Sequence, residues 1–136
     1  MHQDIYPVVG DVLVVDDDPV IIELVTELLM DEGYSVRRAC DGRVAWEAIE
    51  AAPPTLLLTD IRMPFMNGTE LAKRLRTAGY DFSILIMAAT PGLAEPLLTI
   101  DGIEYIAKPF ELELLLEGVR RYVVPSEEFL SASHHR

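Results

Sequence analysis

The chain has 136 residues, half of them hydrophobic, and a formal net charge of -12 at pH 7. This size and apolar content predict one domain whose core needs no disulfide or metal, and the single cysteine, Cys40, excludes an intrachain disulfide and favours a reducing, cytoplasmic setting. The acidic balance argues against direct nucleic-acid binding, and the lack of a long apolar run argues against a membrane span.

Short apolar runs alternate along the chain with segments of helical periodicity, which predicts an α/β domain with a doubly wound parallel sheet. In chain order, the five predicted strands are Val12–Val15, Tyr34–Ala39, Leu56–Leu58, Ile84–Met87 and Ile103–Ala107. The first, third and fourth are continuously apolar, as expected of parallel strands covered on both faces. The second and fifth are more mixed in composition, so we expect them nearer the edges.

Between the strands, apolar residues recur at helical spacing, and capping residues mark the helix ends. The first predicted helix follows the acids at 16–18 and stops at Gly33, and the second spans Arg43–Ala51. Asn67 and Glu70 stand three residues apart, in a variant of the reciprocal capping pattern, before a third helix that is expected to end at Gly79.

The stretch after the fourth strand, TPGLAEPLLTIDG, contains Pro91 and Pro96, which predicts a short or irregular fourth helix. A last helix is expected over roughly Glu111–Val123. These elements predict one domain over residues 11–123, with an N-terminal extension at 1–10 and a flexible C-terminal tail at 124–136.

Charged residues follow three of the predicted strands, where ligands bind in an open α/β sheet. The acids Asp16–Asp18 follow the first strand, Asp60 follows the third, and Lys108 follows the fifth. Asp18 precedes Pro19, so we expect it to cap the first helix. The other acids would repel one another in a shared cleft, and a hard divalent cation such as Mg²⁺ would offset that repulsion.

Three motifs carry a family resemblance: VLVVDDDP, LLLTDIRMPFMNG and YIAKPF, in this order. Over roughly residues 11–123 the chain resembles the receiver domain of two-component response regulators. The resemblance implies a flavodoxin-like sheet of five parallel strands in the order 2-1-3-4-5. It also implies that Asp60 takes a phosphoryl group from a histidine kinase or a histidine phosphotransfer protein, forming an acyl phosphate. Phosphotransfer and autodephosphorylation would occur on the chain itself, without turnover of a separate substrate.

The resemblance further implies roles for the residues around the phosphoacceptor. The implied ligands of Mg²⁺ are the carboxylates of Asp16, Asp17 and Asp60 and the backbone carbonyl of Arg62. Lys108 would present a fixed positive charge to a phosphoryl oxygen. In the family the Lys-Pro bond is commonly cis, which would make Pro109 a structural device that aims Lys108.

One position departs from the family pattern, which usually ends the fourth strand with Thr or Ser. Alignment on the apolar run places Ala88 there. The alternative is Thr90, two residues later, which would supply the hydroxyl if the loop brings it into reach. In the family, that hydroxyl moves toward the phosphoryl group and an aromatic residue, here Tyr105, turns in behind it. A lost hydrogen bond to a charged group is worth roughly 1.5–3 kcal/mol, so Ala88 is expected to weaken the coupling between phosphorylation and output.

Output and two alternatives stay open from the sequence. The chain is expected to act by docking on an unknown downstream protein, either alone or as a receiver cut from a longer chain. One alternative is a pseudo-receiver that binds partners without phosphorylation, which Ala88 favours. The other is a phosphatase similar to haloacid dehalogenases, in which DDDPV would make Asp16 the nucleophile.

Overall fold

The computed structural model describes residues 8–63, 66–88, 102–108 and 111–125. A parallel sheet of five strands forms its centre, in the order β3-β2-β4-β5-β6. In chain order these strands are β2 (Asp11–Val15), β3 (Ser35–Ala39), β4 (Leu56–Asp60), β5 (Ser83–Ala88) and β6 (Ile103–Ala107). The order confirms the predicted sequence of strands, 2-1-3-4-5, and with it the flavodoxin-like fold.

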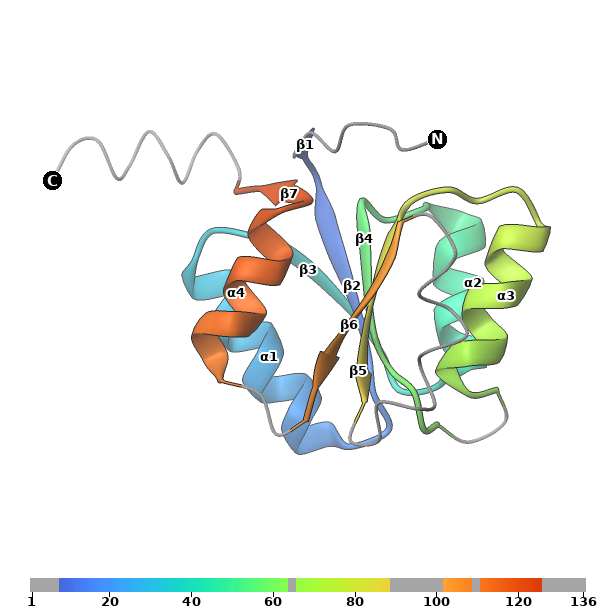
Figure 1. Ribbon diagram of the computed structural model, residues 1–136, viewed down its shortest axis with the longest axis horizontal. Coiled ribbons are helices and arrows are strands. Elements are labelled where there is room, and N and C mark those ends of the chain that lie inside the picture. Colours follow the sequence, from blue (N-terminus) through green and yellow to red (C-terminus); the bar gives the residue numbers. More distant parts are fainter. Residues whose placement is uncertain (1–7, 64–65, 89–101, 109–110, 126–136) are drawn as a thin grey trace, which may run out of the picture.

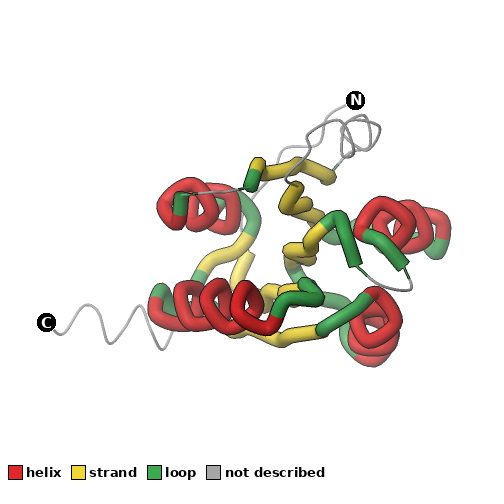
Figure 2. The backbone as a smooth tube through the Cα atoms, turned by 90° about the horizontal axis from the view of Figure 1, so that it is seen from below, coloured by secondary structure: helices red, strands yellow, loops and turns green. Residues whose placement is uncertain are grey.

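Four helices cover the sheet in the described part of the chain: α1 (Pro19–Asp31), α2 (Gly42–Ala51), α3 (Gly68–Thr77) and α4 (Leu112–Arg120). Helices α1 and α4 lie on one face, and α2 and α3 lie on the other (Figure 1). Figure 2, seen from below, shows the strands enclosed between these two pairs of helices. The predicted short fourth helix falls on residues 89–101, outside the described residues.

The two faces of the sheet form two separate cores because side chains alternate along a strand. In β2, Val12 and Val14 pack with α1 and α4, whereas Leu13 and Val15 pack with α2 and α3. All residues of β4 are buried, including its last residue, Asp60. Burial on both faces explains why the central strands are continuously apolar.

Side chains close the helix ends near the sheet edge at which the strands finish. Asp18 caps α1, with its carboxylate accepting a hydrogen bond from the amide of Val20 at 2.9 Å. Asp41 caps α2 in the same way, and the side chain of Asn67 accepts from the amide of Glu70 at the start of α3. These caps fix where each helix begins beside the strand ends.

The last helix is shorter than the sequence pattern predicted. It ends at Arg120, and Val123–Val124 instead form a short strand, β7, which pairs in parallel with β1 (Val8–Val9). The helical spacing of apolar residues extends to Val123, but this residue is β-branched and is buried by strand pairing instead. The predicted tail lies, apart from its first two residues, outside the described part of the chain.

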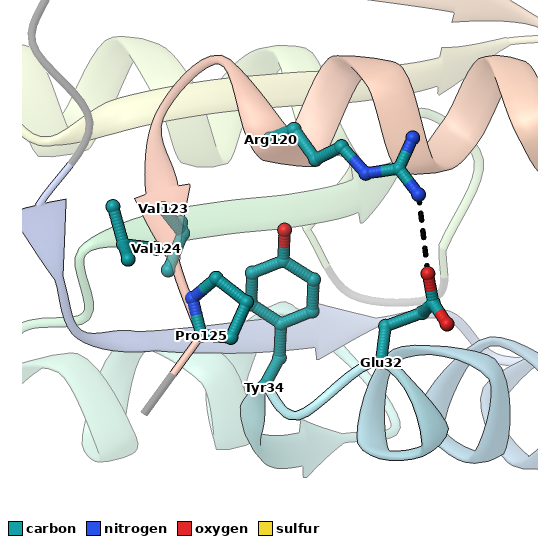
Figure 3. Close-up of a pocket in the computed structure, with 6 residues that line it drawn as sticks. All are labelled: Glu32, Tyr34, Arg120, Val123, Val124 and Pro125. Atoms are coloured by element: carbon teal, nitrogen blue, oxygen red, sulfur yellow. Dashed lines mark hydrogen bonds and ion pairs between the residues drawn. The ribbon is translucent and has the colours of Figure 1, made fainter. Parts of the chain in front are cut away.

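Side-chain contacts stabilise the end of the sheet at which the strands begin. Arg37 pairs with Asp11 at 2.6 Å and donates to the carbonyl oxygen of Ala52 at 2.7 Å, tying the end of α2 to β2. A hollow of about 310 Å³ opens at this edge, where Arg120 and Glu32 form an ion pair above Tyr34 (Figure 3). It lies at the opposite edge of the sheet from Asp60.

Candidate functional site

The strand order brings the predicted acids together. Strand β2 pairs directly with β4, so Asp16, which follows β2, lies beside Asp60, which ends β4. Carboxylate oxygens of Asp16, Asp17 and Asp60 lie within 4.8 Å of one another. Asp16 and Asp60 are buried, whereas Asp17 is exposed, so the cluster lies at the surface with one side open to solvent.

Lys108, which follows β6, lies at the same end of the sheet as these acids and pairs with two of them. Its ammonium nitrogen lies 3.1 Å from Asp60 Oδ1 and 3.3 Å from Asp16 Oδ2. The backbone amide of Lys108 donates to the carbonyl oxygen of Ala88 at 2.9 Å, which ties the end of β6 to the end of β5. The fold therefore holds one cation between two buried carboxylates.

Burial and charge act in opposite directions on these groups. Burial raises the pKa of Asp16, with a further rise from the charge of Asp60, and these effects outweigh the lowering by the Asp18 amide and by Lys108. Burial lowers the pKa of Lys108, but its hydrogen bonds and charge interactions with Asp60 and Asp16 together raise it above the ordinary value. Lys108 is thus charged at neutral pH, while the charge on Asp16 is costly without a further cation.

The backbone after β4 closes tightly around Asp60. The amide of Ile61 donates to Asp60 Oδ1 at 3.0 Å, so this oxygen has two donors, the amide and Lys108. The amide of Gly68 donates to the carbonyl oxygen of Ile61 at 2.8 Å. A side chain at position 68 would meet the Asp60 carbonyl oxygen, since a Cβ there would lie at 2.4 Å. This close approach therefore requires glycine at position 68.

The donor set fits Mg²⁺ in chemical type. Hard divalent cations prefer carboxylate and carbonyl oxygens, and Mg²⁺ commonly keeps several waters, which suits a cluster with one exposed acid. Asp16, Asp17 and Asp60 supply the carboxylates, and Arg62 lies exposed two residues beyond Asp60. The charge on buried Asp16 is compensated only in part by Lys108 and the Asp18 amide, which gives a physical reason for a further cation at this place.

The predicted switch residues are placed only in part. Ala88 is fully buried at the end of β5, and Tyr105 is half-buried on the neighbouring strand β6, packed against the core cluster that contains Ala88. Position 88 thus carries no hydroxyl. Thr90 and Pro109 lie outside the described residues, so their predicted roles stay predictions.

Sequence reasoning missed two features near the site. Thr59 is fully buried beside Asp60, and its hydroxyl donates to the Asp60 carbonyl oxygen at 2.9 Å. Gly42, at the start of α2, lies in close contact with Met66. A polar residue next to Asp60 at the end of an apolar run was a usable signal for Thr59, whereas nothing in the sequence pairs positions 42 and 66.

Comparisons with known proteins agree with this geometry. The family described as the response regulator receiver domain matches residues 12–120. Response regulator MprA of Mycolicibacterium vanbaalenii is 38% identical over 111 residues, covering 80% of this chain and 48% of the relative. The MprA protein of Mycobacterium leprae is 37% identical over the same length. The chain thus spans about half the length of the curated relatives it matches.

Solved structures show the same architecture. The chemotaxis protein CheY4 of Vibrio cholerae superposes with a TM-score of 0.76 at 32% identity, covering 85% of this chain and 99% of that one. The receiver domain of NtrX from Brucella abortus gives a TM-score of 0.76 at 28% identity, covering 82% and 96%. Among the described residues, no helix combines the length and apolar content needed to cross a bilayer.

Proposed function

The chain belongs to the response regulator receiver domain family, and we propose on that premise that Asp60 accepts a phosphoryl group from a histidine kinase or a histidine phosphotransfer protein. The observation that carries the proposal is the cluster at the strand ends, where Asp60 lies buried among Asp16, Asp17 and Lys108. Such a cluster combines a carboxylate nucleophile with a lysine that can offset phosphoryl charge and with two acids that can hold a cation for the same purpose.

The proposed reaction moves one phosphoryl group between two residues. A carboxylate oxygen of Asp60 attacks phosphorus, the N–P bond of the phosphohistidine breaks, and the imidazole leaves with the bonding electron pair and takes up a proton. Asp60 Oδ1 already accepts from Ile61 and pairs with Lys108, so we assign the attack to Oδ2. The product is an acyl phosphate on Asp60, and attack by water on that acyl phosphate returns the free carboxylate.

The neighbouring residues would hold charge in place during transfer. Lys108 lies where its ammonium can pair with a phosphoryl oxygen, since it already contacts Asp60 and is held by the Ala88 carbonyl oxygen through its backbone. The carboxylates of Asp16, Asp17 and Asp60, with the carbonyl of Arg62, would hold Mg²⁺. When bound, Mg²⁺ supplies positive charge that draws the nucleophile and the phosphoryl oxygens together.

We further propose that output follows from docking on a downstream protein and that Ala88 weakens the link between phosphorylation and output. Buried Ala88 offers no hydroxyl to the phosphoryl group, so no side chain at position 88 moves toward that group and makes room for Tyr105 to turn inward. The same observation favours the second candidate, a pseudo-receiver that docks without phosphorylation. The phosphatase alternative loses support, because the family that matches residues 12–120 is the receiver family.

The test is an intact-mass measurement after incubation with acetyl phosphate and Mg²⁺, with Asp60→Asn alongside. One added phosphoryl group in the wild type alone supports the proposal. No addition in a folded protein that binds Mg²⁺ would favour the pseudo-receiver. Addition to both proteins would move the acceptor to Asp16 or another residue.

A further inference from the structure

Gly42, the first residue of α2, leaves no room for a side chain on the side that faces Met66. A Cβ added at Gly42 would lie 2.8 Å from the Cβ of Met66 and 2.8 Å from its backbone oxygen, and real Cβ atoms essentially never come within 3.0 Å of such atoms. The contact involves backbone, which cannot rotate out of the way as a side-chain tip can.

The glycine at this position is not explained by backbone conformation. The glycines with positive φ are Gly33, Gly79 and Gly102 among the described residues, and Gly42 is not one of them. Alanine is also the better helix former, so at the start of α2 it would ordinarily be favoured. Close approach to Met66 is therefore the reason that remains for a residue without a side chain.

Met66 leads directly to the residues that close around Asp60. Gly68 lies two positions later, and a Cβ there would lie 2.4 Å from the carbonyl oxygen of Asp60 and 3.0 Å from the Cα of Ile61. The segment Met66–Gly68 is thus confined between α2 on one side and the end of β4 on the other. A displacement of the backbone at Met66 is therefore expected to reach Asp60 through Gly68, whose contact with the end of β4 leaves little room.

We propose that Gly42 is a positioning residue for the chemistry at Asp60. By lacking a side chain it lets Met66–Gly68 lie against α2, and this fixes the backbone at Asp60, Ile61 and Arg62. The inference rests on the proposed function, since that backbone carries the phosphoacceptor and the carbonyl expected to bind Mg²⁺. Gly42 itself is not expected to contact the ion or the phosphoryl group.

The experiment measures Mg²⁺ binding by titration calorimetry in the wild type and in Gly42→Ala. Residues that orient metal ligands typically change metal affinity by 10–100-fold, and for this indirect contact we expect a loss of about 10-fold. The rate of phosphorylation by acetyl phosphate at saturating Mg²⁺ is expected to fall as well. The matched control is Ile49→Val, which loosens the buried side of the same helix and adds no atom beside Met66.

A purely structural role predicts the same Mg²⁺ affinity in Gly42→Ala and Ile49→Val once both are folded, and that result would overturn the inference. The route through Met66 is tested in a Met66→Gly background, which lacks two of the three close side-chain and backbone atoms. There the contacts with the Met66 side chain are gone and only its backbone oxygen remains close, so adding Gly42→Ala is expected to cost at most ~3-fold. An undiminished 10-fold loss overturns the route through the Met66 side chain.

The background variant also serves if Gly42→Ala alone does not fold, since the double variant then provides the comparison. The failure of the inference is separable from the failure of the proposed function. A wild type that binds Mg²⁺ and is phosphorylated, with Gly42→Ala indistinguishable from it, overturns the inference alone. A wild type that binds no Mg²⁺ overturns both.

Discussion

Replacing Lys108 by methionine isolates the role of the one cation held between two buried acids. Methionine keeps most of the apolar stem and removes only the charge. In the wild type the ammonium contacts Asp16 and Asp60 at 3.3 and 3.1 Å, with side-chain exposures of 22% for Lys108 and 1% and 11% for the two acids. Removal of the ammonium therefore leaves the negative charges of two neighbouring, largely buried carboxylates with less compensating positive charge.

The size of the effect follows from burial. Breaking a fully buried ion pair by removing one partner costs about 3–5 kcal/mol, since the remaining charge stays unpaired. Partial exposure of Lys108 and the open side of the cluster reduce this, so we expect Lys108→Met to lose about 2 kcal/mol of unfolding free energy without Mg²⁺. For a domain of this size that is a fall in Tm of roughly 6 °C.

Magnesium should reverse most of this loss. A ligand at 100 times its Kd adds about 2.7 kcal/mol to stability, and in the variant the ion no longer competes with an ammonium for the carboxylate oxygens. We therefore expect a larger stabilisation by Mg²⁺ in Lys108→Met than in the wild type. Urea unfolding followed by circular dichroism, with and without Mg²⁺, measures both effects, and exposed Lys73→Met on α3 is the matched control.

Two results would refute this reasoning. Equal stability of Lys108→Met and wild type without Mg²⁺ would show that the ion pairs contribute nothing. A loss of stability that stays the same at saturating Mg²⁺ would show that the cation does not replace the ammonium at this cluster.

Three further predictions concern other residues. Burial raises the pKa of Asp16 above 3.8, so the folded state takes up its proton before the unfolded chain does. Asp16→Asn should therefore be more stable than wild type at neutral pH without Mg²⁺. Urea unfolding should show the difference in unfolding free energy between the two proteins shrinking toward about pH 4. A difference that grows toward acid pH would contradict the raised pKa of Asp16. Arg37→Lys cannot keep contacts with both Asp11 and the end of α2, so it should lose ~1–2 kcal/mol in urea unfolding while calorimetry finds Mg²⁺ affinity unchanged; altered affinity would link the two edges of the sheet. Ala88→Thr should enlarge the phosphorylation-dependent NMR shifts around Tyr105, with a gain of roughly one to two powers of ten in the switch equilibrium; identical shifts in both proteins would reject the uncoupling.

The strands and the acid cluster were predictable because both follow from local patterns. Continuous apolar runs marked β2, β4 and β5, and parallel strands finish at one edge, so acids directly after two adjacent strands had to meet. Asp18 was separable from Asp16 by a purely local signal, the proline after it. The presence of Lys108 between Asp16 and Asp60 followed from the family resemblance, since spacing along the chain does not specify it.

Features that depend on contacts between distant segments were not predictable in this way. The chain leaves the helix before β7, and β7 forms by pairing with Val8–Val9, which lie more than 110 residues earlier. Tyr122, just before β7, donates a hydrogen bond from its hydroxyl to Glu104. The periodicity of α4 alone extends the helix to Val123. The contact of Gly42 with Met66 likewise joins two turns whose sequences give no sign of each other.

The pairing of β1 with β7 has a consequence for protein engineering. Val8 lies opposite Val123 in this ribbon, so the chain nearly closes on itself at the sheet edge farthest from Asp60. Because the two strands are parallel, a linker that runs back from Val124 to Val8 would make a continuous loop. The loop could be reopened at exposed Gly79, where a side chain would meet nothing within 4 Å. Such a circular permutant would give the domain new ends beside Tyr80, whose ring meets the single tryptophan, Trp46, edge to face. The acid cluster, at the other edge of the sheet, would keep its native connections.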